Sequence, residues 1–288
     1  MLMAAAGAVL FASKGLFSKA LFHQGVDYTT LTALRALLAL PLFLGLAMQR
    51  GLRLQGLPRK AVLQAAIAGV LCYTIGALVD FHALELVDIC LERALLFSYP
   101  ALVVLWTALV RRRLPSPTVC LALVATWAGI LLVVGGFDAA AWQRNLTGAL
   151  MVLFCATTTA TYFLLGERCI PQLGSTGFTI IAMTAATLGV LVWFLLTHSV
   201  AAVARIDTQG WLRLGALAVL CMFLPTLLQA GAIRRIGAVR GALAASVGPP
   251  ASLLFGALLL GERPAVAQWV GTALVVAGVV LISRPSDA

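Results

Sequence analysis

Long apolar runs separated by short polar connections make up almost the whole sequence. Each run holds about twenty residues, the length that an α-helix needs to cross roughly 30 Å of hydrocarbon. The connections carry helix-breaking residues such as Pro58, Pro115, Pro117 and the pair Gly135 and Gly136. Windows of about nineteen residues predict ten transmembrane helices, at Met1–Phe22, Tyr28–Met48, Ala61–Phe81, Ile89–Val110, Thr118–Val134, Leu146–Leu165, Phe178–Thr197, Leu212–Ala232, Gly241–Leu260 and Val266–Ser283. The predicted fold class is therefore all-α, a polytopic membrane protein.

The composition excludes a soluble globular protein. Of the 288 residues, 62% are hydrophobic and only 10% are charged, whereas an ordinary soluble domain is roughly 25% charged. So few charges cannot cover the surface of a soluble fold of this length. The six cysteines form no CxxC pair, and five of them lie inside apolar runs. They are expected to act as small hydrophobic residues, and we predict no metal site and no cofactor.

The distribution of basic residues predicts the orientation in the membrane. The formal net charge is +10, which in a soluble protein would suggest a nucleic-acid partner. Here the basic residues gather in alternate connections, which indicates topology and no nucleic-acid binding. Twelve lie in one set of connections and at the C-terminus: Arg50, Arg53, Arg59, Lys60, Arg111, Arg112, Arg113, Arg168, Arg234, Arg235, Arg240 and Arg284. The opposite set holds only Arg144, Arg205, Arg213 and Arg263. The positive-inside rule then predicts a protein of the cell (inner or plasma) membrane with both termini in the cytoplasm.

The chain also contains a faint internal repeat. A shift of 150 residues places Tyr99-Pro100-Ala101 over Pro249-Pro250-Ala251 and Arg113 over Arg263. These matches indicate a duplicated five-helix unit, at residues 1–136 and 146–284. Because five is odd, the two copies must enter the membrane in opposite orientations. Inverted repeats of this kind allow one side of a central site to close while the other opens; the alternative is a duplicated helical bundle without a transport role.

Two segments resemble a known family. The stretch from Ala244 through Pro249 and Pro250 to Gly261-Glu262-Arg263 is similar to the end of the second repeat in EamA-type members of the drug/metabolite transporter superfamily. The stretch from Arg93 through Pro100 to Gly129 resembles the end of the first repeat. The resemblance covers nearly the whole chain. It implies a membrane transporter in families that export amino acids, other metabolites and toxic compounds, and it does not name the cargo.

Ionisable residues inside the spans are the first candidates for the chemistry of the site. A charge in the hydrocarbon costs at least ~2.5–3.5 kcal/mol at a helix centre, so it is a functional hypothesis by default. Lys14 lies in the first span, Arg35 in the second, and Glu92 and Arg93 in the fourth. All four belong to the outward half of the first repeat. Glu92 has two candidate roles, as a carrier of a coupling proton or as an ion-pair partner that fixes helix packing.

Aromatic and hydroxyl residues extend this candidate cavity. In the fourth span Asp88, Glu92, Tyr99 and Trp106 are spaced by four, seven and seven positions, which predicts one shared interior face. Tyr73 precedes Asp80 by seven positions in the third span. The predicted cavity residues are Lys14, Arg35, Tyr73, Glu92, Arg93, Tyr99, Trp106, Thr158 and Tyr162, with Pro100, Pro249 and Pro250 as structural or hinge positions. The threonine hydroxyls could instead bond to carbonyls of their own helix.

The predicted function is a secondary transporter, an exporter of small metabolites such as amino acids. Basic residues outnumber acidic ones among the span charges, which favours an anionic group in the site. No GxxxxGK[ST] motif is present, which argues against built-in ATP drive. The alternatives are a lipid or lipid-linked sugar flippase and, less favoured, a membrane-embedded enzyme, for which no HExxH or paired-carboxylate motif is found. The expected partners are a small-molecule substrate and the lipid bilayer, with a homodimer possible through small-residue stripes such as Ala267/Gly271.

Overall fold

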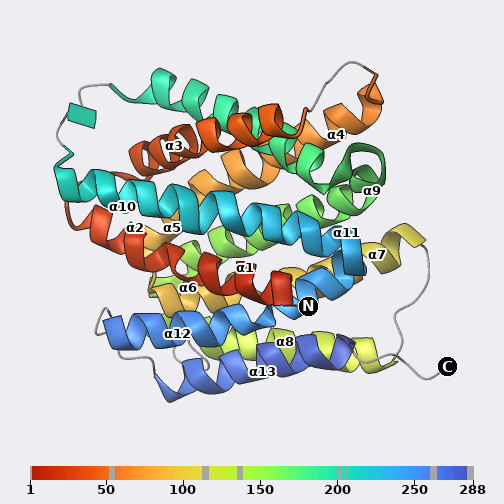
Figure 1. Ribbon diagram of the computed structural model, residues 1–288. Helices are drawn as coiled ribbons and strands as arrows, with labels where there is room; N and C mark the ends of the chain where they lie inside the picture. Colours follow the sequence, from red (N-terminus) through yellow and green to blue (C-terminus); the bar gives the residue numbers. More distant parts are fainter. Residues whose placement is uncertain are drawn as a thin grey trace.

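The computed structural model confirms the all-α fold class. Among the residues that the structure describes, every regular element is a helix and no strand is present. The described residues are 2–51, 56–111, 117–134, 139–199, 203–204, 206–259 and 265–283. The helix axes run roughly parallel to one another, from left to right in Figure 1.

The first half of the chain forms helices that are repeatedly interrupted. Its elements are α1 (Leu2–Ala12), α2 (Lys14–Phe22), α3 (Tyr28–Gln49), α4 (Arg59–Gly69), the π-helical turn η1 (Val70–Gly76), α5 (Ala77–Leu86), α6 (Ile89–Leu96), α7 (Tyr99–Arg111) and α8 (Pro117–Val134). The segments α4, η1 and α5 follow one another without a gap, and only Ser13 separates α1 from α2. Short breaks therefore occur inside stretches that the hydrophobic pattern predicts as single helices.

The second half repeats this style of interrupted helix. Its elements are α9 (Ala139–Thr197), α10 (Thr208–Ala218), the π-helical turn η3 (Val219–Phe223), α11 (Leu224–Ala244), the 3₁₀ turn η4 (Ala245–Val247), α12 (Gly248–Leu259) and α13 (Val266–Ser283). Gly174 within α9 has φ +71° and Gly237 within α11 has φ +78°. Such left-handed backbone favours glycine, and it divides each of these long helices into two.

Several helices have the length and composition of membrane spans. In the part of the chain that the structure describes, five helical stretches qualify: Leu2–Phe22, Tyr28–Gln49, Arg59–Leu86, Gln143–Thr197 and Thr208–Ala242. The outer surface carries large apolar side chains, with Leu196 and Leu258 each 77% exposed. An apolar surface of this kind belongs in lipid, because in water it would be an aggregation liability. The protein is therefore a multi-pass membrane protein, whereas the number of ten spans remains a prediction.

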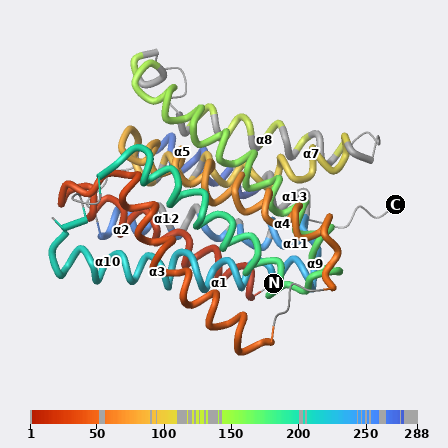
Figure 2. The backbone as a smooth tube through the Cα atoms, turned by 90° about the horizontal axis from the view of Figure 1, so that it is seen from above, coloured from red at the N-terminus to blue at the C-terminus, as the bar shows by residue number. Residues whose placement is uncertain are grey.

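The interior is built around α9, which packs against α3, α4, η1, α5 and α11. Figure 2 shows these segments running together through the bundle, while α8 and α13 pack along each other at one edge in Figure 1. The main core cluster combines alanines with aromatic rings, among them Phe43, Tyr73, Tyr99 and Phe163. Small residues on facing helices let the helix axes approach closely.

The fourth predicted helix is broken at Phe97 and Ser98, between α6 and α7. The reason is Pro100, which has no N–H to donate to a carbonyl one turn earlier and fits best in the first turn of a new helix. Pro249 and Pro250 likewise lie in the first turn of α12, directly after η4. The three proline positions thus mark the starts of helices, and their hinge role remains a prediction; the side chains of Pro249 and Pro250 lie outside the described residues.

The close contact of α4 with α9 at Gly69 gives a first testable prediction. A Cβ atom added at Gly69 would overlap the carbonyl group of Ala182, whereas one added at Gly45 in α3 would meet no atom within 4 Å. We expect Gly69→Ala to lower the free energy of unfolding by roughly 1–3 kcal/mol, because the two helices must move apart. Gly45→Ala, the matched control, should be neutral or slightly stabilising. Thermal unfolding in detergent measures both, and equal unfolding temperatures would contradict this packing.

Candidate functional site

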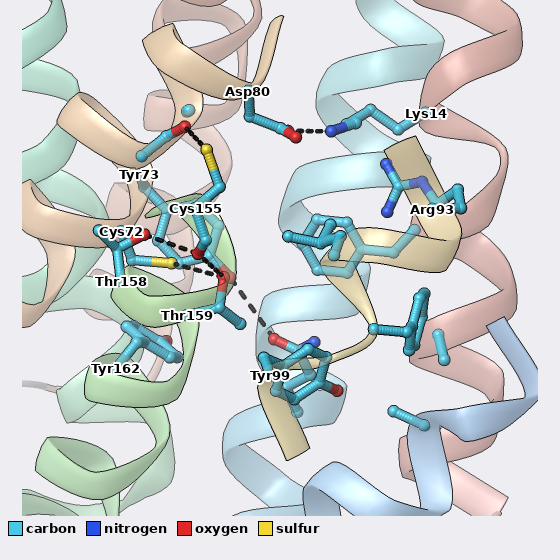
Figure 3. A pocket seen from close by; sticks show the side chains of 18 of the residues that line it. Lys14, Cys72, Tyr73, Asp80, Arg93, Tyr99, Cys155, Thr158, Thr159 and Tyr162 are labelled. Carbon is cyan, nitrogen blue, oxygen red and sulfur yellow. Dashed lines mark hydrogen bonds and ion pairs between the residues drawn. The ribbon is translucent and has the colours of Figure 1, made fainter. Parts of the chain in front are cut away.

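A cavity lies at the centre of the bundle and is lined by residues from both halves of the chain. It leaves about 70 Å³ for the centres of water-sized molecules, which is room for several waters or a small solute group. Its walls come from α1, α2, α3, η1, α5, α6, α7, α9, α11 and η4. Figure 3 shows that the charged side chains of Lys14, Asp80 and Arg93 gather at one end, whereas Tyr99 and Tyr162 lie at the other.

The charged end is organised by Lys14, the first residue of α2. Its Nζ pairs with Oδ2 of Asp80 on α5 and lies 3.3 Å from Oε1 of Glu92 on α6. Glu92 Oε2 lies 2.9 Å from Nε of the neighbouring Arg93, an ion pair whose angles do not make a hydrogen bond. Lys14, Glu92 and Arg93 are each no more than 3% exposed. The carboxylates offset the burial of these cations and so hold three helices together.

Arg35 on α3 is the remaining cation of this end. Its guanidinium carbon lies 4.4 Å from the centre of the Phe81 ring, over which Lys14 Nζ also lies, at 4.9 Å. Within the described part of the chain no carboxylate forms an ion pair with Arg35, and its Nε has no hydrogen-bond partner. Three buried cations therefore face the two buried carboxylates of Asp80 and Glu92.

The opposite end of the cavity is aromatic. The rings of Tyr73 on η1 and Tyr162 on α9 are 5.2 Å apart and nearly perpendicular, and Tyr99 on α7 lies 5.2 Å from Phe163. Tyr73 donates its hydroxyl hydrogen to Gln229 Oε1 at 3.5 Å. The buried hydroxyls of Tyr99 and Tyr162 have no partner among the described residues. This end combines flat apolar surface with polar groups that are free to bind.

The threonines of α9 form a side wall between the two ends. Thr158 and Thr159 both line the cavity, and each donates its hydroxyl hydrogen to the carbonyl of Cys155, at 2.8 and 2.9 Å. Bonds to the residue's own helix are the alternative that the sequence leaves open. Thr159 Oγ1 also lies 3.9 Å from Cys72 Sγ, within hydrogen-bond distance. Because both hydroxyl hydrogens are used, these residues can accept a hydrogen bond but have no spare donor.

The structure brings together most of the residues that the sequence predicts. Seven of the nine predicted cavity residues line it: Lys14, Arg35, Tyr73, Arg93, Tyr99, Thr158 and Tyr162. Glu92 lies behind the wall and reaches the site through Lys14 and Arg93.

Trp106 does not line the cavity, because its side chain is 40% exposed on α7. The predicted interior position of Trp106 is therefore wrong. The spacing predicts a shared face only for one continuous helix from Asp88 to Trp106. The break at Phe97 and Ser98 changes which face of α7 points to the interior.

Comparison with known proteins identifies the family. The model of the EamA-like transporter family matches residues 1–135 and again residues 146–284. The chain belongs to the EamA-like transporter family. A relative from Bacillus subtilis (strain 168), named "Uncharacterized transporter YcbK", is 31% identical over 269 residues, which are 92% of this chain and 86% of the relative. The predicted family is confirmed, and the protein is a membrane transporter.

A solved structure shares the same fold. The crystal structure of another protein superposes with a TM-score of 0.72 over 98% of this chain and 95% of the other. The two sequences are 18% identical, so the likeness concerns the helix arrangement alone. The helical bundle of this EamA-like transporter is thus a fold that a solved structure also contains.

Some cavity residues of this EamA-like transporter were absent from the sequence prediction. Asp80 is the most important, because it pairs with Lys14; its signal was the spacing from Tyr73, but Glu85 and Asp88 nearby made it resemble part of an outer connection. Gln229 comes from the second half of the chain, and applying the 150-residue repeat to Asp80 leads to within one position of it. Phe11, Cys72, Phe97 and Cys155 also line the cavity, and nothing in their sequence context distinguishes them from packing residues.

The ion-pair cluster gives a second prediction. Lys14→Met leaves Asp80 without its partner, and removing one partner of a buried pair costs about 3–5 kcal/mol. We expect a clear fall in the unfolding temperature for this variant. The double variant Lys14→Met with Asp80→Asn also removes the unpaired carboxylate, so it should unfold at a higher temperature than the single variant.

Lys60→Met is the matched control, since Lys60 is exposed at the start of α4. It should leave the unfolding temperature unchanged. A double variant as unstable as Lys14→Met alone would show that the pair does not act as a unit.

Proposed function

We propose that this transporter is a secondary exporter of small carboxylate-bearing metabolites such as amino acids, working by alternating access between two inverted five-helix repeats. The observation that carries the proposal is the buried cavity between the two halves of the chain, with charges at one end and tyrosines at the other. Buried charges in a membrane protein mark substrate or ion pathways in most cases. A concave site with a few convergent polar groups among apolar and aromatic walls is the usual form of a small-molecule site.

The positions of the helix ends support a duplication. The element starting at Arg59 has a counterpart starting at Thr208, and the π-helical turns start at Val70 and Val219. The last helix of each half starts at Pro117 and at Val266. In all three pairs the second position follows the first by 149 residues (208 against 59, 219 against 70, 266 against 117). The double match of the family model supports the same division.

The direction of the helices supports an inversion. In Figure 1, α8 begins on the right of the bundle and α13, its counterpart, begins on the left, so the two run antiparallel where they pack. Taking Gly174 and Gly237 as helix ends groups the described elements into ten spans, five in each half. Five spans per repeat reverse the orientation of the second copy, and inverted repeats support alternating access.

The two proline-associated breaks are candidate joints for this motion. Phe97 at the first break and Ala245 at the second both line the cavity. A Cβ atom added at Gly248, the first residue of α12, would overlap the Phe97 ring, so the breaks of the two halves contact each other. Broken helices beside the substrate site occur in transporters with inverted repeats, and this contact would link movement of one half to the other.

A lipid or lipid-linked sugar flippase is the competing function. It needs a path that opens sideways to lipid, and one groove favours it. This groove lies between η1, α5 and α9 and is lined mostly by apolar residues, among them Val70, Ile75, Val79, Val192, Trp193 and Leu196. His82 and Tyr28 also line it. Its lining contains none of the residues of the charged cavity, which favours the metabolite exporter.

The orientation is a third prediction. We expect both termini in the cytoplasm of an inner or plasma membrane, since basic residues remain on that side. Green fluorescent protein fused to the C-terminus should fluoresce and alkaline phosphatase fused there should be inactive. Phosphatase fused to a chain truncated after Val134, the end of α8, should be active. The reverse pattern in the two fusions would overturn the orientation.

Transport is the direct test and the fourth prediction. Proteoliposomes loaded with labelled amino acids should release at least one of them faster than protein-free liposomes loaded in the same way. Glu92→Gln and Lys14→Ala should each slow that release by about tenfold or more, because each disturbs a charged contact at the cavity. Lys60→Ala, at an exposed basic residue, should not slow it.

Unfolding temperatures of the same preparations separate lost transport from lost folding. A second arm follows labelled lipid in the same liposomes. Transfer of lipid without release of any amino acid would favour the flippase, and unchanged release by folded Glu92→Gln and Lys14→Ala would show that the assigned cavity is not the site.

A further inference from the structure

The charge count of the buried cluster leaves one cation without a carboxylate. Asp80 is occupied by Lys14, and Glu92 lies between Lys14 and Arg93. Arg35, which is 2% exposed, lies over the face of Phe81 and forms no ion pair in the described part of the chain. Arg93 Nη2 is also buried without a hydrogen-bond partner there. Both guanidinium groups line the cavity.

A buried guanidinium whose N–H donors have no partner can bind an anion. Leaving a charge buried and unpaired is costly, whereas guanidinium donors match the two oxygens of a carboxylate in geometry and charge. The protein supplies no further carboxylate at this end among its described residues. An anionic group of a ligand would complete the cluster and bring its net charge to zero.

The other end of the cavity constrains the rest of the ligand. Tyr73, Tyr99 and Tyr162 present rings together with two unpaired hydroxyls. No carboxylate lies among the residues that line this end, so nothing there would balance a ligand ammonium group. A flat ring fits these walls, since aromatic pairs gain from stacked or edge-to-face contact.

We propose that the cavity selects aromatic carboxylates with a net charge of −1 over zwitterionic amino acids. The carboxylate binds Arg35 and Arg93, and the ring lies against the tyrosines. This inference rests on the proposed function and narrows its substrate class. A monoanion leaves the buried cluster neutral, a zwitterion leaves one excess positive charge, and a cation leaves two.

Three compounds that share one ring test the charge rule. Hydrocinnamate is phenylalanine without the amine, and phenethylamine is phenylalanine without the carboxylate. Calorimetric binding to the purified full-length protein in detergent should give an affinity for hydrocinnamate about tenfold or more above that for phenylalanine. Phenethylamine should not bind measurably. Equal or tighter binding of phenylalanine, or no binding of hydrocinnamate, would overturn the inference.

Variants of Arg35 test the residue itself. Arg35→Gln should weaken hydrocinnamate binding at least about tenfold. It should leave the unfolding temperature without ligand equal or higher, because both carboxylates keep their partners and the excess charge is gone. Arg35→Lys should retain part of the affinity. Arg59→Gln, the same change at an exposed arginine, should alter neither property. A fall in unfolding temperature or a failure to fold for Arg35→Gln would show a structural role instead and overturn the assignment.

Transport in proteoliposomes separates this inference from the proposed function. If the protein releases amino acids but does not bind hydrocinnamate, the preference for aromatic monoanions is wrong and the proposed exporter function still stands. Tight hydrocinnamate binding with no release of any compound would support the site and contradict the exporter.

Discussion

The ion pair of Lys14 with Asp80, extended to Glu92 and Arg93, is the interaction on which the rest of the site depends. In the hydrocarbon region water cannot solvate these charges, so each must find its partner within the protein. That requirement draws α2, α5 and α6 together. The cavity forms beside this junction, and its charged end is the side of the cluster that the carboxylates leave uncovered.

The fold was predictable where the membrane constrains the backbone to be helical. Apolar runs must be helical because every backbone polar group needs an internal partner, and the predicted run Tyr28–Met48 differs by one residue from α3. Interruptions were harder, since a window of about nineteen residues averages over a break of two. Pro100 signalled a bend, but only the structure shows that the chain starts a new helix there. Trp106 was misplaced for that reason.

The candidate site was predictable in proportion to the cost of burying each residue. Lys14, Arg35 and Glu92 stand out in a sequence because a charge in a span needs a reason. Asp80 was hidden by the acidic residues that follow it. Gln229 and Phe97 are ordinary in their own segments and become site residues only because α11 and the break before α7 come together at the cavity. Such contacts depend on tertiary packing, which single-sequence patterns do not contain.

The two halves share a framework but not a chemistry. At 149 positions after Lys14, Arg35, Asp80 and Arg93 stand Phe163, Thr184, Gln229 and Ala242, none of them charged. Only Gln229 of these four lines the cavity, where it bonds Tyr73 at the aromatic end. The charged residues that line the cavity therefore all come from the first half of the chain, whereas in the proposed mechanism both halves would supply the helix arrangement for an exchange of conformations. A cavity built this way keeps its charged end and its aromatic end in fixed places. A ligand would therefore present the same end to Arg35 from whichever side of the membrane it enters.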